Sequence, residues 1–424
     1  MTLVIDADRV IADLRELAAA SGGEHAGAKR LAWSPDWETA RAWLNGRLAE
    51  LNGVAVDRDE AGNLWAHLSG DDGAPDGFVV VGSHIDAVPS GGWLDGALGI
   101  LTALEVLRTL AAADAPPPIA VRLVDWADEE GARFGRSLVG SSAVAGTLDP
   151  DDVRGLLDAE GTTLQAAMAS VGVDLDGASA ATARLDGARA YLELHIEQGP
   201  VLLDSGRLAS AVSGTFGDER YLVTFTGQSA HAGSTPMHLR RDTLAAAATA
   251  ALEIREVGIR HGGVTTVGSI ASKPAVITAI AGESEMMLDL RHLDADTLAT
   301  MLAECLDACE RAAQKFECGV EPRRVFGATP TPFHPMLVSL ARAAVDAAGG
   351  GDGDPIPSGP LHDATEIGRL VPTVMIFAQS DPPISHTEVE DSPLDALRVA
   401  IEAYGRTVGE TIALVAAGEL EAVR

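Results

Sequence analysis

The sequence predicts an α/β protein in which a smaller α+β unit interrupts a larger α/β domain. Before residue 213, short apolar runs typical of buried strands alternate with segments of helical spacing. Over 213–328 the expected order becomes strand, helix, strand, strand, helix, strand, the βαββαβ order of a ferredoxin-like unit. After that the α/β pattern resumes. We therefore assign residues 1–212 and 329–424 to one discontinuous domain and 213–328 to an insert.

The first part of the larger domain begins with a hairpin and continues with three buried strands. GVAVDRDEAGNLWAHLSG (53–70) reads as the hairpin. GFVVVGSH (77–84), PIAVRLVDWADEEG (118–131) and ARAYLELHIEQGPVL (188–202) are apolar runs that end in polar residues. Helical spacing over 96–114 separates the first two of them. In parallel sheets binding residues gather beyond the carboxyl ends of the strands, so these polar ends predict a site.

The insert and the C-terminal part are read from the same periodicities. In the insert we expect strands at 219–228, 263–272, 283–294 and 320–330, and helices at 241–258 and 295–316. In the C-terminal part we expect a helix at 336–348, a strand at 371–379 and a helix at 392–416.

Composition excludes several classes of protein. The net charge is −31, from 62 acidic and 31 basic residues, so the surface repels nucleic acid and anionic membranes. The N-terminus lacks the basic and apolar regions of a signal peptide. No stretch of about 18 uninterrupted apolar residues predicts a membrane span. Three closely spaced cysteines without a fourth metal ligand fit packed thiols. A cytoplasmic protein is expected.

The first polar cluster lies in GSHIDAVPSGGWLDGALGI (82–100). His84 ends an apolar strand, and Asp86 could accept the proton of one ring nitrogen and leave the other for a metal. Asp95 precedes a glycine that opens a helix, where its carboxylate could span two cations. Taken alone, these residues also fit a structural histidine and an ordinary Asp-Gly turn.

The second cluster is an acidic loop, and the fourth is a loop that contains a histidine. WADEEGARFG (126–135) places Asp128, Glu129 and Glu130 at a strand end, where adjacent carboxylates repel one another unless cations or solvent separate them. His386 lies in ISHTEVED (384–391), after the last strand. A solvated acidic loop and an ordinary surface histidine remain the alternatives.

The third cluster lies within the strand of YLELHIEQGP (191–200). Strand alternation puts Glu193, His195 and Glu197 on one face. Burying such groups without partners costs roughly 2–7 kcal/mol each, so they need a shared purpose or a half-exposed edge strand.

Together the clusters predict a centre for two metal ions in the larger domain. Imidazole and carboxylate ligands suit Zn²⁺, Mn²⁺, Co²⁺ or Ni²⁺, and two such ions with a bridging carboxylate activate a water molecule. Glu129, beside a ligand, could be the general base. No serine-hydrolase elbow, H-E-x-x-H or Walker motif is present. The predicted ligands are His84, Asp95, Glu130, His195 and His386.

Six segments in order resemble the M20-type metallohydrolases. They are GSHIDAVPSGGWLDGALGI, WADEEGARFG, ELHIEQGPVL, GQSAHAGSTPMHLRRD, LDLRH and SGPLHDA…ISHTEVED. The resemblance runs from about residue 40 to the C-terminus. The resemblance is most specific to the branch that contains N-carbamoyl-L-amino-acid hydrolases, β-ureidopropionases and allantoate amidohydrolases, for which HIEQG is the marker.

The resemblance implies roles for the predicted ligands. One metal would be held by His84, Asp95 and His195, and the other by Asp95, Glu130 and His386. Glu129 would be the general base, and Asp86 would orient His84.

The resemblance also implies roles in the insert and around the substrate. The insert would be a lid and dimerisation domain whose His231 reaches the partner subunit's active site and steadies the oxyanion. Arg291 would hold the substrate carboxylate, which suits its planar fork. Gln198 matches a position near the substrate.

Two departures from the family pattern concern the substrate. Thr278, in TAIAG, stands where an asparagine usually helps to bind the carboxylate, and a hydroxyl offers fewer groups than an amide. In SGPLHDA, which contributes Gly359 to the substrate site, Leu361 replaces a small glycine. Both changes leave the metal ligands intact.

The sequence thus predicts a homodimeric amidohydrolase with two divalent ions per subunit. We expect it to cleave a linear C–N bond of an N-carbamoyl amino acid or an allantoate-like ureide. An aminoacylase or dipeptidase on the same scaffold is the nearest alternative. A non-catalytic metal-binding protein would have no reason to keep Glu129.

Overall fold

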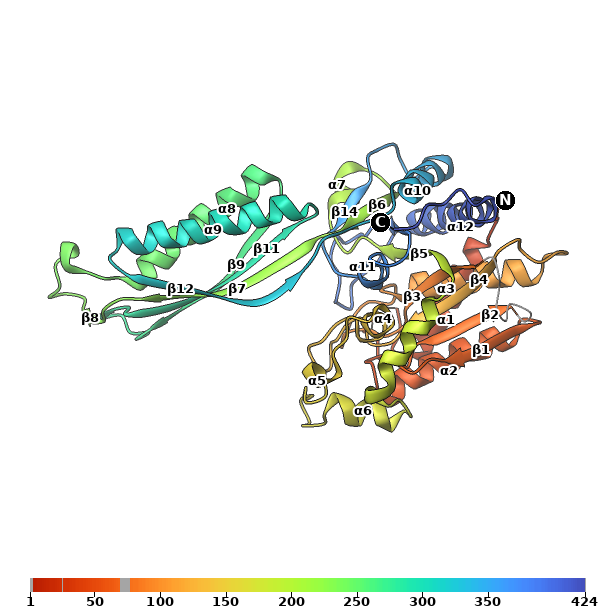
Figure 1. Cartoon of the computed structure of the whole chain (residues 1–424), viewed down its shortest axis with the longest axis horizontal. Coiled ribbons are helices and arrows are strands. Elements are labelled where there is room, and N and C mark those ends of the chain that lie inside the picture. The colour runs from red at the N-terminus through yellow and green to blue at the C-terminus, as the bar shows by residue number, and fades with distance from the viewer. Residues whose placement is uncertain (1–2, 25, 69–76, 424) are drawn as a thin grey trace. The chain divides into compact units, whose positions relative to one another are not determined.

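The protein forms two compact units. We describe it from a computed structural model that covers residues 3–24, 26–68 and 77–423 (Figure 1). One unit is formed by Met1–Gly214 together with Phe333–Arg424, and the other by Thr215–Pro332. These borders fall a few residues after the boundaries read from the sequence. The chain is a mixed α/β protein, as predicted.

Four neighbouring parallel strands form the centre of the larger unit. They are β4 (Ala120–Trp126), β3 (Phe78–His84), β5 (Ala188–Ile196) and β15 (Thr373–Ala378), in that order across the sheet. Both faces of these strands are buried, which explains their nearly continuous apolar sequences. Because the strands are parallel and adjacent, the residues that follow their carboxyl ends share one edge of the sheet.

Further strands complete this sheet on both sides, and β2 and β6 pair antiparallel with the central strands β4 and β15. The complete order is β1-β2-β4-β3-β5-β15-β6-β13, and β14 also pairs with β6. The added strands are β1 (Val54–Arg58), β2 (Leu64–Leu68), β6 (Ala209–Thr215), β13 (Thr331–Pro332) and β14 (Ile356–Ser358). The predicted hairpin is therefore present as β1 and β2.

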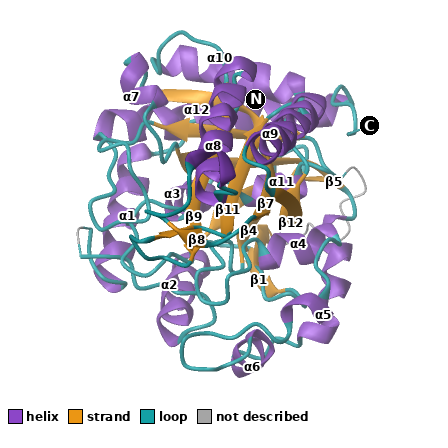
Figure 2. Ribbon diagram, turned by 90° about the vertical axis from the view of Figure 1, so that its left-hand side faces the viewer, coloured by secondary structure: helices purple, strands orange, loops and turns teal. Residues whose placement is uncertain are grey.

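Helices cover the sheet and enclose two apolar cores (Figure 2). α3 (Ala97–Ala111) follows β3 and is buried on nearly all sides, which its apolar sequence allows. α2 (Pro35–Ala49) starts with proline in its first turn and a serine cap, a strong start signal. The other helices of this part are α1 (Ala7–Ala20), α7 (Val201–Ser205), α10 (Pro335–Ala348), α11 (Asp363–Ile367) and α12 (Leu394–Ala417).

The segment between β4 and β5 contains short helices that we do not predict from the sequence. Their small and polar residues lack the long apolar periodicity on which a helix assignment depends. Side-chain caps from Asp149, Thr163 and Asp174 define three of their starts. The helices are α4 (Val139–Ala145), α5 (Pro150–Val153), α6 (Leu164–Ser170) and the 3₁₀ segment η1 (Leu175–Leu185).

The smaller unit is a four-stranded antiparallel sheet with two helices on one face (Figure 1). Its long elements follow the chain order strand, helix, strand, strand, helix, strand, and the sheet order is β12-β7-β11-β9. A two-stranded sheet, β8 (Ala230–His231) with β10 (Ala279–Ile280), adjoins β11 in sequence. The long elements are β7 (Gly217–Thr226), α8 (Thr243–His261), β9 (Val264–Lys273), β11 (Glu283–His292), α9 (Ala295–Lys315) and β12 (Gly319–Ala328).

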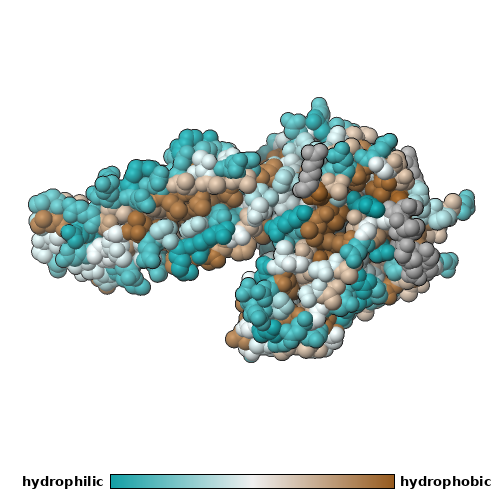
Figure 3. Space-filling view, viewed as in Figure 1, coloured by the Kyte–Doolittle hydropathy of each residue, from teal (hydrophilic) through white to brown (hydrophobic). Residues whose placement is uncertain are grey.

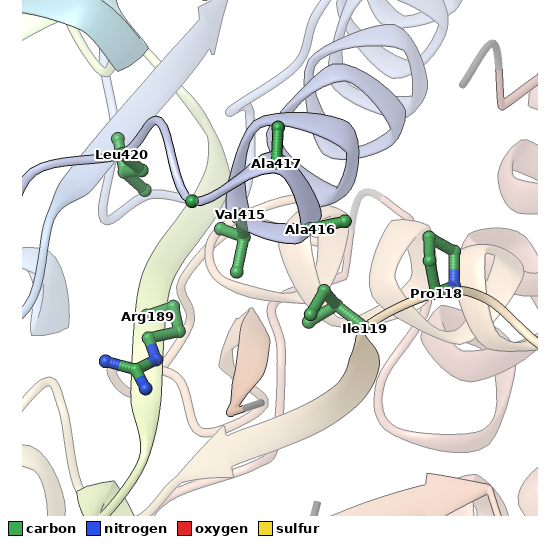
Figure 4. A pocket seen from close by; sticks show the side chains of 8 residues that line it. Pro118, Ile119, Arg189, Val415, Ala416, Ala417 and Leu420 are labelled. Atoms are coloured by element: carbon green, nitrogen blue, oxygen red, sulfur yellow. The ribbon is translucent and has the colours of Figure 1, made fainter. Parts of the chain in front are cut away.

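A pocket opens at the amino ends of β4 and β5, next to the end of α12 (Figure 4). It is lined mostly by apolar side chains, including Ile119, Val415 and Leu420, with Arg189 at its side. None of the predicted metal ligands lines it. Among the described residues, no helix is long and apolar enough to cross a membrane.

Candidate metal centre

The ends of the four parallel strands carry the polar clusters. His84 is the last residue of β3, and His195 is the last but one of β5. Glu130 follows β4, and His386 follows β15. Asp95 lies in the turn that leads from β3 into α3. The structure therefore brings all five predicted ligands to one edge of one sheet.

Asp95 stands between two groups of ligands and offers one carboxylate oxygen to each. Its Oδ1 lies 3.1 Å from His195 Nε2 and 3.6 Å from His84 Nε2. Its Oδ2 lies 3.5 Å from His386 Nε2, which is 3.3 Å from Glu130 Oε2. Within each group the nearest ligand atoms all lie within 4.8 Å of one another. This is the arrangement expected of a carboxylate that bridges two cations.

Main-chain carbonyls orient the two buried histidines toward Asp95. His84 Nδ1 lies 3.1 Å from the carbonyl oxygen of Asp86, and His195 Nδ1 lies 2.9 Å from that of Ile196. Each Nδ1 must therefore carry the proton, which leaves the lone pair on Nε2 for a metal. The N–H of Gly96, which donates to His195 Nε2 at 3.3 Å, agrees with a lone pair there.

Several features fit a pair of divalent cations. Asp95, His84 and His195 are almost completely buried, and one oxygen of Glu130, whose side chain is 5% exposed, has no hydrogen-bond partner among the described residues. Such a concentration of carboxylates is unfavourable without positive charge. The close packing also requires glycine at Gly96, where a Cβ would lie 2.4 Å from His84 Cε1 and φ is +64°.

Glu129 lies beside the centre and takes part in neither group. Its Oε2 is 3.8 Å from His84 Nε2, and its side chain is buried. Burial raises the pKa of Glu129 well above its usual value, although His84 opposes this rise. A carboxylate whose basicity is increased in this way, next to two predicted metals, is suited to accept a proton from water.

Asp86 makes contacts in addition to the one predicted from the sequence. Its Oδ1 is 3.6 Å from His84 Nδ1, so its main-chain oxygen is the closer partner of the ring. Its two carboxylate oxygens accept the N–H groups of Glu129 and Glu130, each at 3.2 Å. Asp86 thus joins the turn after β3 to the loop after β4.

The pKa values of the buried groups follow from burial and from mutual charge. Burial alone would lower the pKa of His84, but the carboxylates of Glu129, Asp86 and Asp95 outweigh it and raise that pKa well above its usual value. Burial would raise the pKa of Asp95, yet the hydrogen bond and charge of His195 lower it instead. Both shifts describe the protein without cations, because a metal would take the place of the shared protons.

Of the three predicted substrate residues of the larger unit, Gln198 contacts a predicted ligand directly. Gln198 has φ +61°, and its Nε2 donates to Asp95 Oδ2 at 3.0 Å. Gly359 and Leu361 lie in the segment before α11. The next residue, His362, places its ring 4.6 Å from that of His195, centroid to centroid. The half-buried Leu361 is thus one residue from a group packed on a predicted ligand.

The two glutamates that share the strand face of His195 have structural partners. Glu193 is fully buried and accepts hydrogen bonds from Ser83 Oγ and Tyr191 Oη at 2.8 and 3.0 Å. Glu197 accepts the N–H groups of Val201 and Leu202 and so stabilises the start of α7. The face predicted from alternation is present, but only His195 belongs to a ligand group.

Sequence reasoning did not identify Glu390 as part of the centre. It is fully buried, and its Oε1 accepts the N–H of Asp95 at 3.1 Å. Burial and the charge of Asp95 raise the pKa of Glu390 to about 7. The sequence feature that could have identified Glu390 is its position four residues after His386, within the same segment ISHTEVED.

The remaining predicted residues belong to the smaller unit. His231 is exposed on β8, and its Nδ1 accepts the N–H groups of Gly233 and Ser234 at 3.1 and 3.2 Å. Its Nε2 therefore carries the proton and is a hydrogen-bond donor. Thr278 lies next to it, since the Thr278 carbonyl accepts the N–H of Ala232 at 2.8 Å.

Arg291 lies in the four-stranded sheet, at the end of β11 away from β10. It faces Asp218 across β7 and β11, eight residues along β11 from Glu283, which is close to β10. Eight residues of strand span roughly 27 Å. Its Nε donates to Asp289 Oδ1 at 2.9 Å. The structure therefore brings His231 and Thr278 together and separates both from Arg291.

Comparison with known proteins establishes the family. Residues 80–410 match the model of peptidase family M20/M25/M40. The chain belongs to this family. The predicted resemblance to M20-type hydrolases and the predicted hydrolase class are both confirmed.

The relatives of this M20-family chain match it over almost its whole length. An N-carbamoyl-L-amino acid amidohydrolase of Geobacillus stearothermophilus is 34% identical and covers 96% of this chain and 98% of its own. An allantoate amidohydrolase of Escherichia coli is also 34% identical, over 89% of this chain and 91% of its own. The crystal structure of a hydantoinase/carbamoylase family amidase from Burkholderia multivorans has a TM-score of 0.85 at 30% identity and covers 99% of this chain and 100% of that one.

Proposed function

We propose that this M20-family hydrolase cleaves the ureido C–N bond of an N-carbamoyl amino acid or an allantoate-like ureide. The observation that carries the proposal is Asp95, whose two oxygens face two separate ligand groups with Glu129 beside them. The 34% identity to amidohydrolases with these two substrate classes supports the choice of substrate.

We propose that the centre holds two divalent ions, of Zn²⁺, Mn²⁺, Co²⁺ or Ni²⁺. His84, Asp95 and His195 would hold one, and Asp95, Glu130 and His386 the other. When bound, such ions lower the pKa of water and polarise a carbonyl group.

The residues around the ions would move the protons. Glu129 accepts a proton from the attacking water and passes it to the leaving nitrogen as the C–N bond breaks. Asp86 fixes the main chain of Glu129 and so holds the base in place during both transfers. For an N-carbamoyl amino acid the products are the amino acid, CO₂ and ammonia.

We propose that the smaller unit is a lid and dimerisation domain. One small substrate cannot contact His231 and Arg291 of the same insert, because Arg291 lies roughly 27 Å along β11 from Glu283, and Glu283 follows the β10 strand that pairs with His231. In a dimer, the two residues that contact one substrate can come from different copies of the chain. Arg291 of one copy would hold the substrate carboxylate, and His231 of the other would donate Nε2–H to the developing oxyanion.

Surface composition supports an interface on this unit. Of the twenty large apolar side chains that are exposed in the described part of the chain, ten belong to the insert (Figure 3). Ile277 is 98% exposed and directly precedes Thr278. Apolar side chains gathered on a small unit are typical of a surface that becomes covered on association.

A substrate panel tests the proposed reaction. The purified enzyme, loaded with each metal in turn, is given the N-carbamoyl, N-acetyl, N-formyl and dipeptide forms of one amino acid, and allantoate. We expect the highest kcat/KM for a ureide. A preference for the acetyl or dipeptide form would instead favour an aminoacylase or dipeptidase, with Thr278 and Leu361 as the first residues to examine.

The role of Glu129 is tested with Glu129→Gln, which keeps the shape of the side chain and removes its basicity. Metal content should be unchanged, and kcat should fall by about 10² to 10⁴. Normal turnover in this variant would exclude Glu129 as the base.

Mixing two inactive variants tests whether His231 acts across a dimer. In a mixed dimer of Glu129→Gln and His231→Ala, one site has an intact base and an intact histidine from the other subunit. We therefore expect activity to return when the two variants are unfolded and refolded together. If the mixture stays inactive while wild type recovers under the same treatment, His231 does not act in trans.

A further inference from the structure

The two peptide groups that flank Ile85, between His84 and Asp86, are each held by a side chain that is not a predicted ligand. The N–H of Ile85 donates to Asp125 Oδ1 at 2.9 Å, and its carbonyl accepts from Arg30 Nε at 2.7 Å. Arg30 makes a second contact with the same turn, because its own carbonyl accepts the N–H of Ala87 at 3.1 Å. Arg30 thus contacts the turn after β3 through both its side chain and its main chain.

Arg30 is buried at an energetic cost that no direct ion pair offsets. It is 1% exposed, and its Nη1 donates to Ser21 Oγ at 3.3 Å. Its Nη2 has no hydrogen-bond partner among the described residues, and no carboxylate in that part of the chain lies within 4 Å of its guanidinium. Burying a charged group is unfavourable unless it is paired and hydrogen-bonded.

A second buried arginine in the same region, Arg41, has a hydrogen-bond partner for every nitrogen of its guanidinium group. Arg41 donates to Asp125 Oδ2 at 2.7 Å, to the Asp125 carbonyl at 3.1 Å and to the Gly62 carbonyl at 2.6 Å. Asp125 in turn holds the N–H of Ile85. Arg41 and Asp125 therefore hold the peptide group before Ile85, and Arg30 holds the peptide group after it.

We propose that Arg30 is a positioning residue for the metal centre: it fixes the turn that orients His84 and Asp86. This inference rests on the proposed two-metal site. Asp86 holds the main chain of Glu129 and Glu130, so a displaced turn would disturb both ligand groups. The retained burial of a poorly paired charge is understandable if the turn it holds is needed for function.

Two consequences of removing Arg30 act in opposite directions. Loss of its positive charge would tighten cation binding, since Asp95, Glu390, Asp86 and Glu130 all act on the guanidinium electrostatically. Loss of its hydrogen bond to Ile85 would weaken cation binding by releasing the turn. We expect the second effect to dominate, because removal of groups that orient metal ligands typically costs about 10–100-fold in affinity.

Calorimetric titration of the metal-free full-length chain tests the inference. Arg30→Met should weaken binding of Zn²⁺ or Mn²⁺ by about 10–100-fold. Arg30→Lys keeps the charge and one donor and should lie between Met and wild type. The control is Arg58→Met, which loses a bond of 3.2 Å to the Val171 carbonyl and an ion pair with Glu38, neither of which involves a ligand turn. The control should bind metal within about twofold of wild type.

Unchanged or tighter metal binding in Arg30→Met overturns the inference. If Arg30→Met does not fold, a folded Arg30→Lys with wild-type affinity overturns it as well. The titration uses no substrate, so it is independent of the proposed reaction. A wild-type protein that binds two cations and hydrolyses no ureide would refute the proposed function and leave this test valid.

Discussion

Two neighbouring tryptophans allow the strength of a hydrogen bond next to Glu129, the proposed general base, to be measured. Trp33 Nε1 donates to Asp128 Oδ2 at 2.6 Å, and both residues are almost fully buried. Asp128 has φ +56° and directly precedes Glu129. Trp37 packs edge-on against Trp33, with ring centroids 5.0 Å apart, and its buried Nε1 has no hydrogen-bond partner in the described part of the chain.

The pair makes Trp37→Phe a matched control for Trp33→Phe. Each substitution turns a buried indole into a phenyl ring, so the packing losses are similar and largely cancel in the comparison. Only Trp33→Phe removes a donor from a buried carboxyl group. A hydrogen bond to a neutral group contributes about 0.5–1.5 kcal/mol and one to a charged group about 1.5–3 kcal/mol.

The protonation state of Asp128 decides which value applies. Burial, followed by the charge of Asp86, raises the pKa of Asp128 to about 8. At pH 6 the carboxyl is neutral, and Trp33→Phe should be less stable than Trp37→Phe by about 1 kcal/mol. At pH 9.5 it is charged, and the difference should grow to about 2–3 kcal/mol.

Urea unfolding of the metal-free variants at both pH values gives these differences from the midpoints and slopes. Equal stability of the two variants at both pH values would refute the hydrogen bond as a stabilising contact. If the stability difference between the two variants shrinks as the pH rises, ionisation of Asp128 does not strengthen this hydrogen bond.

Three further outcomes are expected. Removing metal with a chelator should lower Tm, because the buried carboxylates lose their compensating charge, and adding Mn²⁺ or Zn²⁺ back should restore it. Gly96→Ala should reduce metal content and turnover at least tenfold, since its Cβ would lie 2.4 Å from His84; wild-type metal content measured by mass spectrometry would contradict this. Burial raises the pKa of Asp218 to about 6, so the folded form holds this proton more tightly and stability falls as the pH rises from about 4 to about 6. Asp218→Asn should flatten the pH dependence of Tm in that window, and an unchanged slope would count against the raised pKa.

The placement of the proposed metal ligands at one edge of the sheet could be predicted because the sequence marks strand ends clearly. An apolar run that stops at His84, and another that stops before Asp128, each identify the edge where a parallel sheet places its functional groups. The long helices α3, α8, α9, α10 and α12 followed from their apolar periodicity in the same way, whereas α1 and α2 were not predicted. The small and polar residues between β4 and β5 carry no such periodicity, and their helices start from local caps instead.

The hydrogen bonds that hold the proposed ligands in place could not be predicted, because they involve main-chain atoms. Nothing in the sequence indicates that the Ile85 carbonyl accepts from Arg30, or that Asp86 accepts from two peptide N–H groups of a different loop. Alternation predicted Glu193 and Glu197 on the face of His195, and β5 contains Glu193 but ends one residue before Glu197. Alternation could not show that their partners are a serine, a tyrosine and the start of a helix.

The order in which the chain supplies its ligands has a consequence for biosynthesis. His84, Asp95 and His195 all precede the insert, whereas His386 follows it and arrives with β15, which takes an interior place in the sheet next to β5. A ribosome therefore releases all three members of the first proposed ligand group nearly two hundred residues before His386, the last member of the second. A nascent chain halted within the insert would possess the first group complete and, of the second, Asp95 and Glu130 without His386.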